Sequence, residues 1–395
     1  MKKVLFVIES LACAGAEKSL VNLLNEIDRT KYEIYLQLFS YGGEYEKLLP
    51  DDVTVLPGLK FFDFCAGRTG AACPGEFLLM MWGRIRYSVS IRLKKLTNPQ
   101  KAWVFWRCAR RCFCRSQEFY DIAVAYAQGA PTFYVADRVD AGKKFAWVNV
   151  SYDPGEGFGR EVSAIYENFD GIACVSESAR DAFCTAFPDH SYKCRVIYDM
   201  INAGAISRMA LLPSNAAKLM RNDGWRLLTV GRLAYQKGYD IAIKACMLLK
   251  ERGVDFCWYV LGRGPLESDI REMIRGADVC DRFILLGTDA NPYPYFRLAD
   301  IYVQTSRHEG FGIAIAEARA LNVPVVTTRF DAVSAQMKDG DNGLVVDISP
   351  VSVADGIYRL MCDQTLYSHI SQYQMSEKKD NTDEIRRLYS FMGEC

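Results

Sequence analysis

The sequence has little histidine, no long apolar run and no paired Cys-x-x-Cys motif. Its three histidines are His190, His308 and His369, too few to favour a histidine-dependent hydrolase or metalloenzyme. No stretch reaches the ~18–20 uncharged apolar residues that a membrane-spanning helix needs. The fourteen cysteines have no zinc-type spacing. We therefore expect reduced thiols, most of them buried, and a cytoplasmic location.

The composition is that of a globular protein without an overall charge bias. Half of the 395 residues are apolar and 24% are charged, which excludes an intrinsically disordered chain. The 48 basic and 48 acidic residues cancel, so we expect no nucleic-acid partner. The length predicts two domains. The short apolar run at the start, followed by Glu9, predicts a buried strand rather than a signal peptide.

Short apolar runs alternate with helical patterns in two series, which predicts two doubly wound α/β domains with parallel sheets. The first series runs from Val4–Ser10 to Val196–Tyr198, and the second from Leu227–Gly231 to Gly343–Asp347. Ligands of such sheets bind beyond the carboxyl ends of the strands. With two such domains, we expect the site in the cleft between them.

The stretch with the weakest pattern is Asn202–Gly224, which contains Gly, Pro, Ser and Asn and no clear strand. We interpret it as the linker. The predicted domains are an N-terminal one over residues 1–203 and a C-terminal one over residues 204–373. Residues 374–395 predict a tail helix, and the sequence leaves open which domain it packs on.

Two glycine-containing turns follow strands of the second series. In the first, G-R-L-A-Y-Q-K-G at residues 231–238, Arg232 offers a planar fork and Lys237 a mobile charge. Together they can hold a diphosphate, although two solvated loop cations are the alternative. In the second turn, Gly262 and Gly264 permit a close backbone approach, which is weak evidence of a site by itself.

The most informative motif is S-R-H-E-G-F-G at residues 306–312, which runs into a helix containing Glu317. Backbone amides at the start of that helix suit an anion such as phosphate. Glu309 and Glu317 can accept hydrogen bonds from different hydroxyls of one ligand, as in a sugar attached to a nucleoside. The alternative for Glu317 is a solvated helix face, which its small and apolar neighbours disfavour. Small residues also follow the first strand, at Gly15 and Ala16, where a ligand can approach or a plain turn can form.

In this order and spacing, the motifs G-R-L-x-x-x-K-G, G-x-G-P and S-x-x-E-G-F-G-x-x-x-x-E-A resemble those of the retaining GT-B glycosyltransferases of family 4, the glycosyl transferases group 1. The resemblance is specific over Leu227–Asp347 and weaker before it. It implies a GT-B fold, with two Rossmann-like domains facing across a cleft. By this resemblance, residues 1–203 form the N-terminal, acceptor-side domain and residues 204–373 the C-terminal, nucleotide-sugar-binding domain. It also implies a retaining, metal-independent transfer of a sugar from a nucleotide diphosphate sugar, a UDP- or GDP-sugar, without a cofactor.

The resemblance implies roles for individual residues as well. Arg232 and Lys237 match the residues that grip the donor diphosphate. Glu309 matches the acid that contacts the transferred sugar, and Glu317 the acid that holds the nucleotide ribose. The other positions implied to contact the donor are Gly15, Ala16, Asn149, Gly262, Gly264, Gly287, Gly310, Phe311 and Gly312.

Two positions depart from the family pattern. Asn149 stands where members often carry a histidine near the donor sugar; it can form hydrogen bonds but cannot become cationic. Ala14 stands where members usually have a glycine, and it should fit unless its φ is positive. We expect His308, beside Glu309, to shape the pocket rather than act as an acid or base.

Residues 77–117 carry ten Lys/Arg and no Asp/Glu, interleaved with aromatic residues. A helix of this composition can lie on an anionic membrane surface, which would make the protein peripheral on the inner face of the cell membrane. The main alternative is a helix pair with its aromatics packed inward; a nucleic-acid surface is a weaker one. The cations are Arg84, Arg86, Arg92, Lys94, Lys95, Lys101, Arg107, Arg110, Arg111 and Arg115.

The sequence thus predicts a glycosyltransferase acting on a glycan or lipid-linked acceptor in bacterial surface glycan synthesis. Two alternatives stay open: a GT-B-fold nucleotide-sugar 2-epimerase and a non-catalytic sugar-nucleotide-binding subunit, which the replaced histidine at Asn149 keeps in view. The donor sugar, the base, the acceptor and the linkage are not determined by the sequence.

Overall fold

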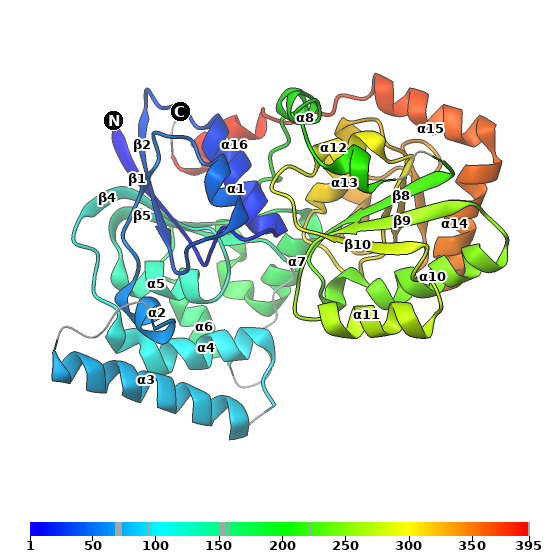
Figure 1. The fold of residues 1–395 in the computed structure, drawn as a ribbon. Helices are drawn as coiled ribbons and strands as arrows, with labels where there is room; N and C mark the ends of the chain where they lie inside the picture. Colours follow the sequence, from blue (N-terminus) through cyan, green and yellow to red (C-terminus); the bar gives the residue numbers. More distant parts are fainter. Residues whose placement is uncertain (68–72, 94, 151–154, 156–157, 221–222, 394–395) are drawn as a thin grey trace. The chain divides into compact units, whose positions relative to one another are not determined.

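The computed structural model describes residues 1–67, 73–93, 95–150, 155, 158–220 and 223–393 (Figure 1). It divides into two compact units. One unit comprises Met1–Ala12, Ala16–Tyr198 and Asp383–Cys395, and the other comprises Cys13–Gly15 and Asp199–Thr382. Each contains a parallel sheet with helices, so the two predicted α/β domains are confirmed. No helix in the described ranges combines the length and apolarity that crossing a bilayer requires.

The first unit is built on a seven-stranded parallel sheet in the order β3-β2-β1-β4-β5-β6-β7. Its strands are β1 (Lys2–Ile8), β2 (Tyr32–Leu38), β3 (Thr54–Val55), β4 (Phe119–Ala125), β5 (Asp140–Val148), β6 (Gly171–Cys174) and β7 (Cys194–Val196). The middle strands are buried on both faces, which explains why they are near-continuous apolar runs rather than alternating ones.

Around this sheet lie α1 (Gly15–Glu26), α2 (Lys60–Cys65), α3 (Pro74–Leu93), α4 (Asn98–Ala109), α5 (Ala130–Arg138), α6 (Gly159–Tyr166) and α7 (Glu177–Ala186), with the 3-10 turns η1 (Glu44–Leu48), η2 (Arg110–Cys112) and η3 (Pro188–Lys193). A capping box starts α4, because Thr97 and Gln100 each accept the other's backbone N–H. From α4, Trp103 and Trp106 enter the core, and the ring of Trp103 lies 5.2 Å from that of Phe133.

The second unit holds a six-stranded parallel sheet in the order β10-β9-β8-β11-β12-β13. Its strands are β8 (Trp225–Val230), β9 (Phe256–Leu261), β10 (Phe283–Gly287), β11 (Ile301–Gln304), β12 (Val325–Thr328) and β13 (Leu344–Val346). The helices are α8 (Ala203–Met209), α9 (Ala216–Leu219), α10 (Tyr239–Glu251), α11 (Glu267–Gly276), α12 (Tyr293–Leu298), α13 (Ile313–Ala320), α14 (Pro350–Cys362) and α15 (Gln364–Ser376), with the 3-10 turns η4 (Tyr235–Lys237) and η5 (Val333–Ala335). On α10, Ile241, Ala245 and Leu249 recur at helical spacing and are buried in the core.

The stretch that the sequence marks as a linker is partly helical. Asn202 caps α8, since its Oδ1 accepts a hydrogen bond from Ala205 N at 2.7 Å. The carbonyl of Met209 accepts from the Asn291 side chain at 2.8 Å, and Met220 is buried. The stretch interpreted as the linker, Asn202–Gly224, thus contains two short helices, and one of its polar residues, Asn202, acts as a helix cap.

The tail helix, α16 (Glu384–Phe391), belongs to the first unit although it follows α15 of the second. The Tyr389 hydroxyl accepts a hydrogen bond from Asp28 N at 2.8 Å, and its ring lies 5.4 Å from that of Tyr32. The ring of Phe391 lies 4.8 Å from that of Phe145. These contacts answer the question of packing that the sequence left open.

We predict that Leu388→Ala destabilises the first unit by about 2–5 kcal/mol, because Leu388 is fully buried on α16 and its removal leaves a cavity. Urea unfolding followed by circular dichroism measures the change. The exposed neighbour Arg386 provides the control, Arg386→Ala, which should leave the midpoint nearly unchanged. Equal midpoints for both variants would show that α16 adds nothing to the unit.

Candidate functional site

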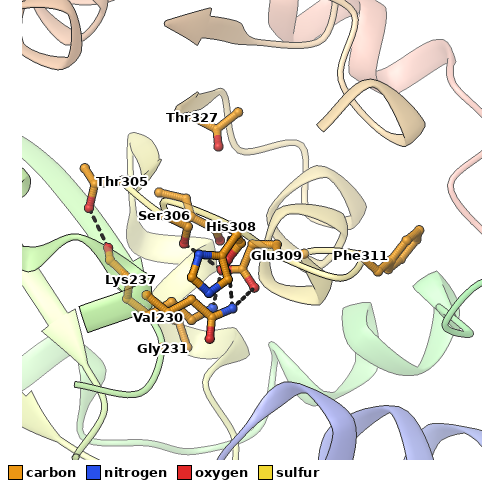
Figure 2. A network of polar contacts seen from close by, with 12 residues as sticks. Val230, Gly231, Lys237, Thr305, Ser306, His308, Glu309, Phe311 and Thr327 are labelled. Atoms are coloured by element: carbon orange, nitrogen blue, oxygen red, sulfur yellow. Dashed lines mark hydrogen bonds and ion pairs between the residues drawn. The ribbon is translucent and has the colours of Figure 1, made fainter. Parts of the chain in front are cut away.

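The centre of the candidate site is an ion pair between Lys237 and Glu309 (Figure 2). Lys237 Nζ lies 2.6 Å from Glu309 Oε1, and the two side chains are only 19% and 9% exposed. Lys237 ends η4, which follows β8, and Glu309 lies in the loop after β11. Because β8 and β11 are neighbours in the sheet, the loops at their carboxyl ends meet.

Further side chains fix the Glu309 carboxylate. Ser306 Oγ donates to its Oε1 at 2.6 Å and Gln304 Nε2 does so at 3.3 Å. Gln236 Nε2 donates to the backbone oxygen of His308 at 2.8 Å, which holds the same loop from the other side. The carboxylate therefore sits in a single orientation with several donors directed at it.

A buried tyrosine extends this network of hydrogen bonds. The Tyr302 hydroxyl donates to Gln304 Oε1 at 2.9 Å, and Gln304 in turn donates to Glu309. Burial, together with the charge of Glu309, raises the pKa of Tyr302 well above its usual value. Tyr302 therefore stays a protonated donor at any physiological pH.

The backbone that carries Lys237 is anchored to the end of β11. Gly238 has φ +64°, and a Cβ there would lie 2.1 Å from the carbonyl oxygen of Thr305, so only glycine fits. Thr305 Oγ1 donates to the backbone oxygen of Lys237 at 2.9 Å. Arg307 forms a two-pronged ion pair with Asp240, at 3.0 and 2.7 Å, which ties the start of α10 to the same loop.

Gly262 and Gly264 make room for the loop that begins at Gly231. A Cβ on Gly262 would lie 2.0 Å from the oxygen of Gly231, and one on Gly264 would lie 2.3 Å from the oxygen of Leu233. Gly262 N also donates to the oxygen of Gly287, which has φ +82°, at 2.6 Å. The structure thus gives Gly262 and Gly264 a packing role and Gly287 a left-handed backbone that accepts a hydrogen bond, and the contact of all three with a donor stays a prediction.

The loop before α13 is held by a residue that the sequence analysis missed. Gln336 is buried and its Nε2 donates to the oxygens of Phe311 and Gly312, at 2.5 and 3.2 Å. Gly312 has φ +90°, a conformation that favours glycine. Gly310 is buried, and Figure 2 shows Phe311 pointing away from the Lys237–Glu309 pair.

Glu317 lies inside the second unit rather than on a solvated face. It is 4% exposed, and its Oε1 accepts a hydrogen bond from the Tyr293 hydroxyl at 2.8 Å. The alternative of a solvated helix face is therefore wrong for Glu317. Tyr293 comes from α12, and no motif in the sequence pointed to it.

Arg232 differs from Lys237 in its surroundings. Its side chain is exposed and forms no hydrogen bond or ion pair with any residue in the described part of the chain. The structure thus brings Lys237 and Glu309 into contact and leaves the Arg232 guanidinium available to an external anion. Among the described residues, no three His, Cys, Asp or Glu side chains are grouped so that they could hold a metal ion.

The candidate residues of the opening loop and of β5 follow strands of the first sheet. Gly15 and Ala16 open α1, and Ala14 does not adopt a positive φ, so the missing glycine causes no strain. Asn149 follows β5; its Nδ2 donates to the oxygen of Tyr126 at 2.7 Å, while its buried Oδ1 has no partner among the described residues. Ser151 and Tyr152, which follow in the same segment, lie outside the described residues.

Comparison with known proteins identifies a family model and several relatives that match part of the chain. Residues 214–377 match the family model of the glycosyl transferases group 1. The alpha-D-kanosaminyltransferase of Streptomyces kanamyceticus is 30% identical over 149 residues, which are 37% of this chain and 39% of that protein. The lipopolysaccharide core biosynthesis glycosyltransferase LpsE of Rhizobium meliloti is 30% identical over 147 residues, 37% of this chain and 42% of that protein. The matches thus span about two fifths of these curated relatives.

Solved structures resemble the chain over nearly its whole length. Anabaena Alr3699/HepE in complex with UDP-glucose gives a TM-score of 0.70 at 17% identity, covering 99% of this chain and 98% of that one. WaaG, a glycosyltransferase involved in lipopolysaccharide biosynthesis, gives 0.66 at 13% identity, covering 99% and 100%.

We predict that Gly264→Ala destabilises the second unit by about 1–3 kcal/mol, because its Cβ would force the loop of Gly231 and Leu233 away. The control is Gly276→Ala, since a Cβ on Gly276 meets no atom within 4 Å. Thermal unfolding compares the two variants. A Gly264→Ala protein as stable as the control would mean that the close approach does not matter.

We also predict a pH dependence that comes from Asp240. Burial alone would raise the pKa of Asp240, but the hydrogen bonds and charge of Arg307 lower it below its usual value. Ionised Asp240 therefore stabilises the folded state above about pH 4, and this contribution is lost as the pH falls through the lowered pKa. The advantage of the wild type over Asp240→Asn in melting temperature should be present at pH 6 and disappear towards pH 3.

The fold is GT-B, with two parallel-sheet α/β units, and residues 214–377 within it are similar in sequence to the glycosyl transferases group 1.

Proposed function

We propose that this protein is a retaining, metal-independent glycosyltransferase that moves a sugar from a nucleotide diphosphate sugar to an acceptor hydroxyl. The observation that carries the proposal is the oriented, mostly buried Lys237–Glu309 pair at the carboxyl edge of the second sheet. The pair lies within the segment that matches the group 1 model, which covers residues 214–377.

The donor and acceptor are proposed by chemical class. Similar solved structures are complexes of those proteins with UDP and with UDP-glucose, so a UDP-sugar is the first donor to test, before a GDP-sugar. One relative, from Campylobacter jejuni, is named as acting on a diphospho-undecaprenol-linked sugar, and LpsE as acting in lipopolysaccharide core biosynthesis. We therefore propose a glycan or lipid-linked acceptor in bacterial surface glycan synthesis.

The residues of the candidate site supply the two functions that such a transfer needs, which are stabilisation of the charge on the diphosphate and positioning of the sugar. The Arg232 guanidinium, which has no partner among the described residues, is suited to the donor diphosphate. Lys237 can share its ammonium between that diphosphate and Glu309. Glu309 stays in place when Lys237 turns, because Ser306 and Gln304 continue to donate to it. Its carboxylate is then free to accept hydrogen bonds from the hydroxyls of the sugar.

The reaction needs no protein base in this proposal. The bond between the anomeric carbon and the diphosphate oxygen breaks, and the acceptor oxygen bonds to that carbon on the same face. The departing phosphate oxygen takes the proton of the acceptor hydroxyl. Glu317, oriented by Tyr293, accepts hydrogen bonds from the nucleotide ribose, and backbone amides near Gly312 face the phosphate.

We predict that Arg232→Ala and Lys237→Ala each lower kcat/KM by about 100-fold or more, because each removes a positive charge that stabilises the leaving diphosphate. Release of UDP during transfer from a panel of UDP-sugars measures the effect. Arg275→Ala, which removes an exposed arginine on α11, is the charge-matched control and should keep full activity. Unchanged turnover in both site variants would refute the proposed diphosphate grip.

Two further measurements separate this proposal from other functions of the same fold. Nucleotide sugars should raise the melting temperature of the protein, since a ligand that binds only the native state stabilises it. Incubation with the donor alone should leave the sugar unchanged. An epimerised sugar nucleotide formed without acceptor would instead show a 2-epimerase, and binding without transfer to any acceptor would show a non-catalytic subunit.

A further inference from the structure

Helix α3 exposes a continuous apolar stripe. Leu78, Trp82, Ile85, Val89 and Leu93 are between 48% and 76% exposed. At 3.6 residues per turn, these five side chains fall within about 80° of the helix circumference. Figure 1 shows α3 as the outermost helix of its unit, with α4 between it and α5. A stripe of this kind on a folded helix marks an interaction surface.

The opposite side of α3 is packed, so the exposed stripe does not result from a poorly folded helix. Met80 and Gly83 are buried, and the Tyr87 ring lies 5.4 Å from that of Phe105 on α4. A Cβ on Gly83 would lie 3.2 Å from Cys112 Sγ, which shows how closely α3 approaches the η2 turn. These inner positions lie about half a turn away from the apolar stripe.

Arginines border the stripe on both sides. Viewed down the helix axis at 3.6 residues per turn, Arg92 points about 20° beyond Ile85 on one edge, and Arg86 about 20° beyond Leu93 on the other. Both are exposed, and neither forms an ion pair with a residue in the described ranges. The acid of α3, Glu76, lies in its first turn and pairs with Lys60 at 3.6 Å. The exposed side of α3 is thus apolar in the middle and positive at its edges.

We propose that α3 is a membrane-docking helix that lies in the plane of an anionic bilayer, with its apolar stripe among the acyl chains and its arginines at the phosphates. The charge at the edges of the stripe indicates which partner binds there, because bilayer phosphates neutralise the arginines on both edges. A second copy of this helix would instead place arginine against arginine. The inference does not depend on the proposed sugar transfer.

The structure also separates two helices that the sequence analysis treated together. On α4, Trp103 and Trp106 are buried, as the alternative of inward-packed aromatics predicted. On α3, Trp82 remains 63% exposed. Membrane docking is therefore assigned to α3 alone and not to residues 77–117 as a whole; Lys94, between the helices, lies outside the described residues.

Trp82 provides a direct probe, because it is the one exposed tryptophan among the six of the chain, all of them within the described residues. The full-length protein is mixed with vesicles of phosphatidylcholine alone or with 30% phosphatidylglycerol, and binding is measured by co-sedimentation. We expect binding to the anionic vesicles only, with weaker binding at high salt. Lipids brominated on the acyl chains should quench Trp82, and the quenching should disappear in Trp82→Phe.

Two pairs of substitutions test the two parts of the surface. Ile85→Ser/Val89→Ser should abolish the quenching, and Arg86→Glu/Arg92→Glu should weaken binding by about fivefold or more for each arginine. The matched controls are Leu211→Ser/Leu212→Ser and Arg275→Glu/Arg359→Glu, which alter exposed residues of the second unit and should bind as the wild type does. Circular dichroism verifies that all variants fold.

Several outcomes would overturn the proposal. Absence of vesicle binding, binding that ignores lipid charge, or an equal loss in the control variants would each do so. A dimer that becomes a monomer in Ile85→Ser/Val89→Ser, without vesicle binding by the wild type, would assign the stripe to contact between copies of the chain. Transfer to a water-soluble acceptor is measured in parallel; it should be unaffected by the α3 variants, so failure of the docking surface and failure of the proposed function are distinguishable.

Discussion

The contact between Lys237 and Glu309 depends on how closely three loops approach one another at the carboxyl edge of the second sheet. The loop after β8 carries the lysine, and the loop after β11 carries the acid. The loop after β9 lies against the first of these with no room for a side chain at Gly262 or Gly264. Burial strengthens the attraction between the two charges, but each charge also loses its hydration. The hydrogen bonds from Ser306 and Gln304 to the carboxylate offset that loss.

This close approach of the loops explains why the motifs contain glycine at these positions. Gly238 adopts a left-handed conformation against the Thr305 carbonyl, and Gly264 lies against the carbonyl of Leu233. Each therefore serves the backbone first, whatever ligand is bound. A glycine-rich motif can therefore predict the position of a site correctly and still suggest the wrong role for an individual glycine. The sequence does not distinguish a glycine that faces a neighbouring loop from one that faces a substrate.

The sequence predicted the features that depend on residues close together in the chain. The two α/β units follow from apolar runs separated by helical patterns, and the positions of Lys237 and Glu309 follow from motifs at strand ends. Residues that act from a distance carried no such signal. Gln336 reaches Phe311 and Tyr293 reaches Glu317 only through the fold, and each is an ordinary polar residue in its own segment. Their partners become visible only when the segments are placed in space.

The linker and the tail show a second limit of sequence reasoning. Asn202 is as typical of a helix cap as of a flexible connection, and its role is decided by whether a helix follows it. For the tail, amphipathic spacing predicted a helix but not the surface that receives it. That surface includes Tyr32 and Phe145, which lie more than 200 residues earlier in the chain.

Helix α3 presents the opposite case, a helix face that no other element covers. Its spacing identifies two faces, and the structure shows that only the one containing Gly83 is covered. The face left uncovered combines apolar and cationic residues, and burial of its apolar stripe is most favourable where the arginines also meet negative charge, which an anionic bilayer surface supplies.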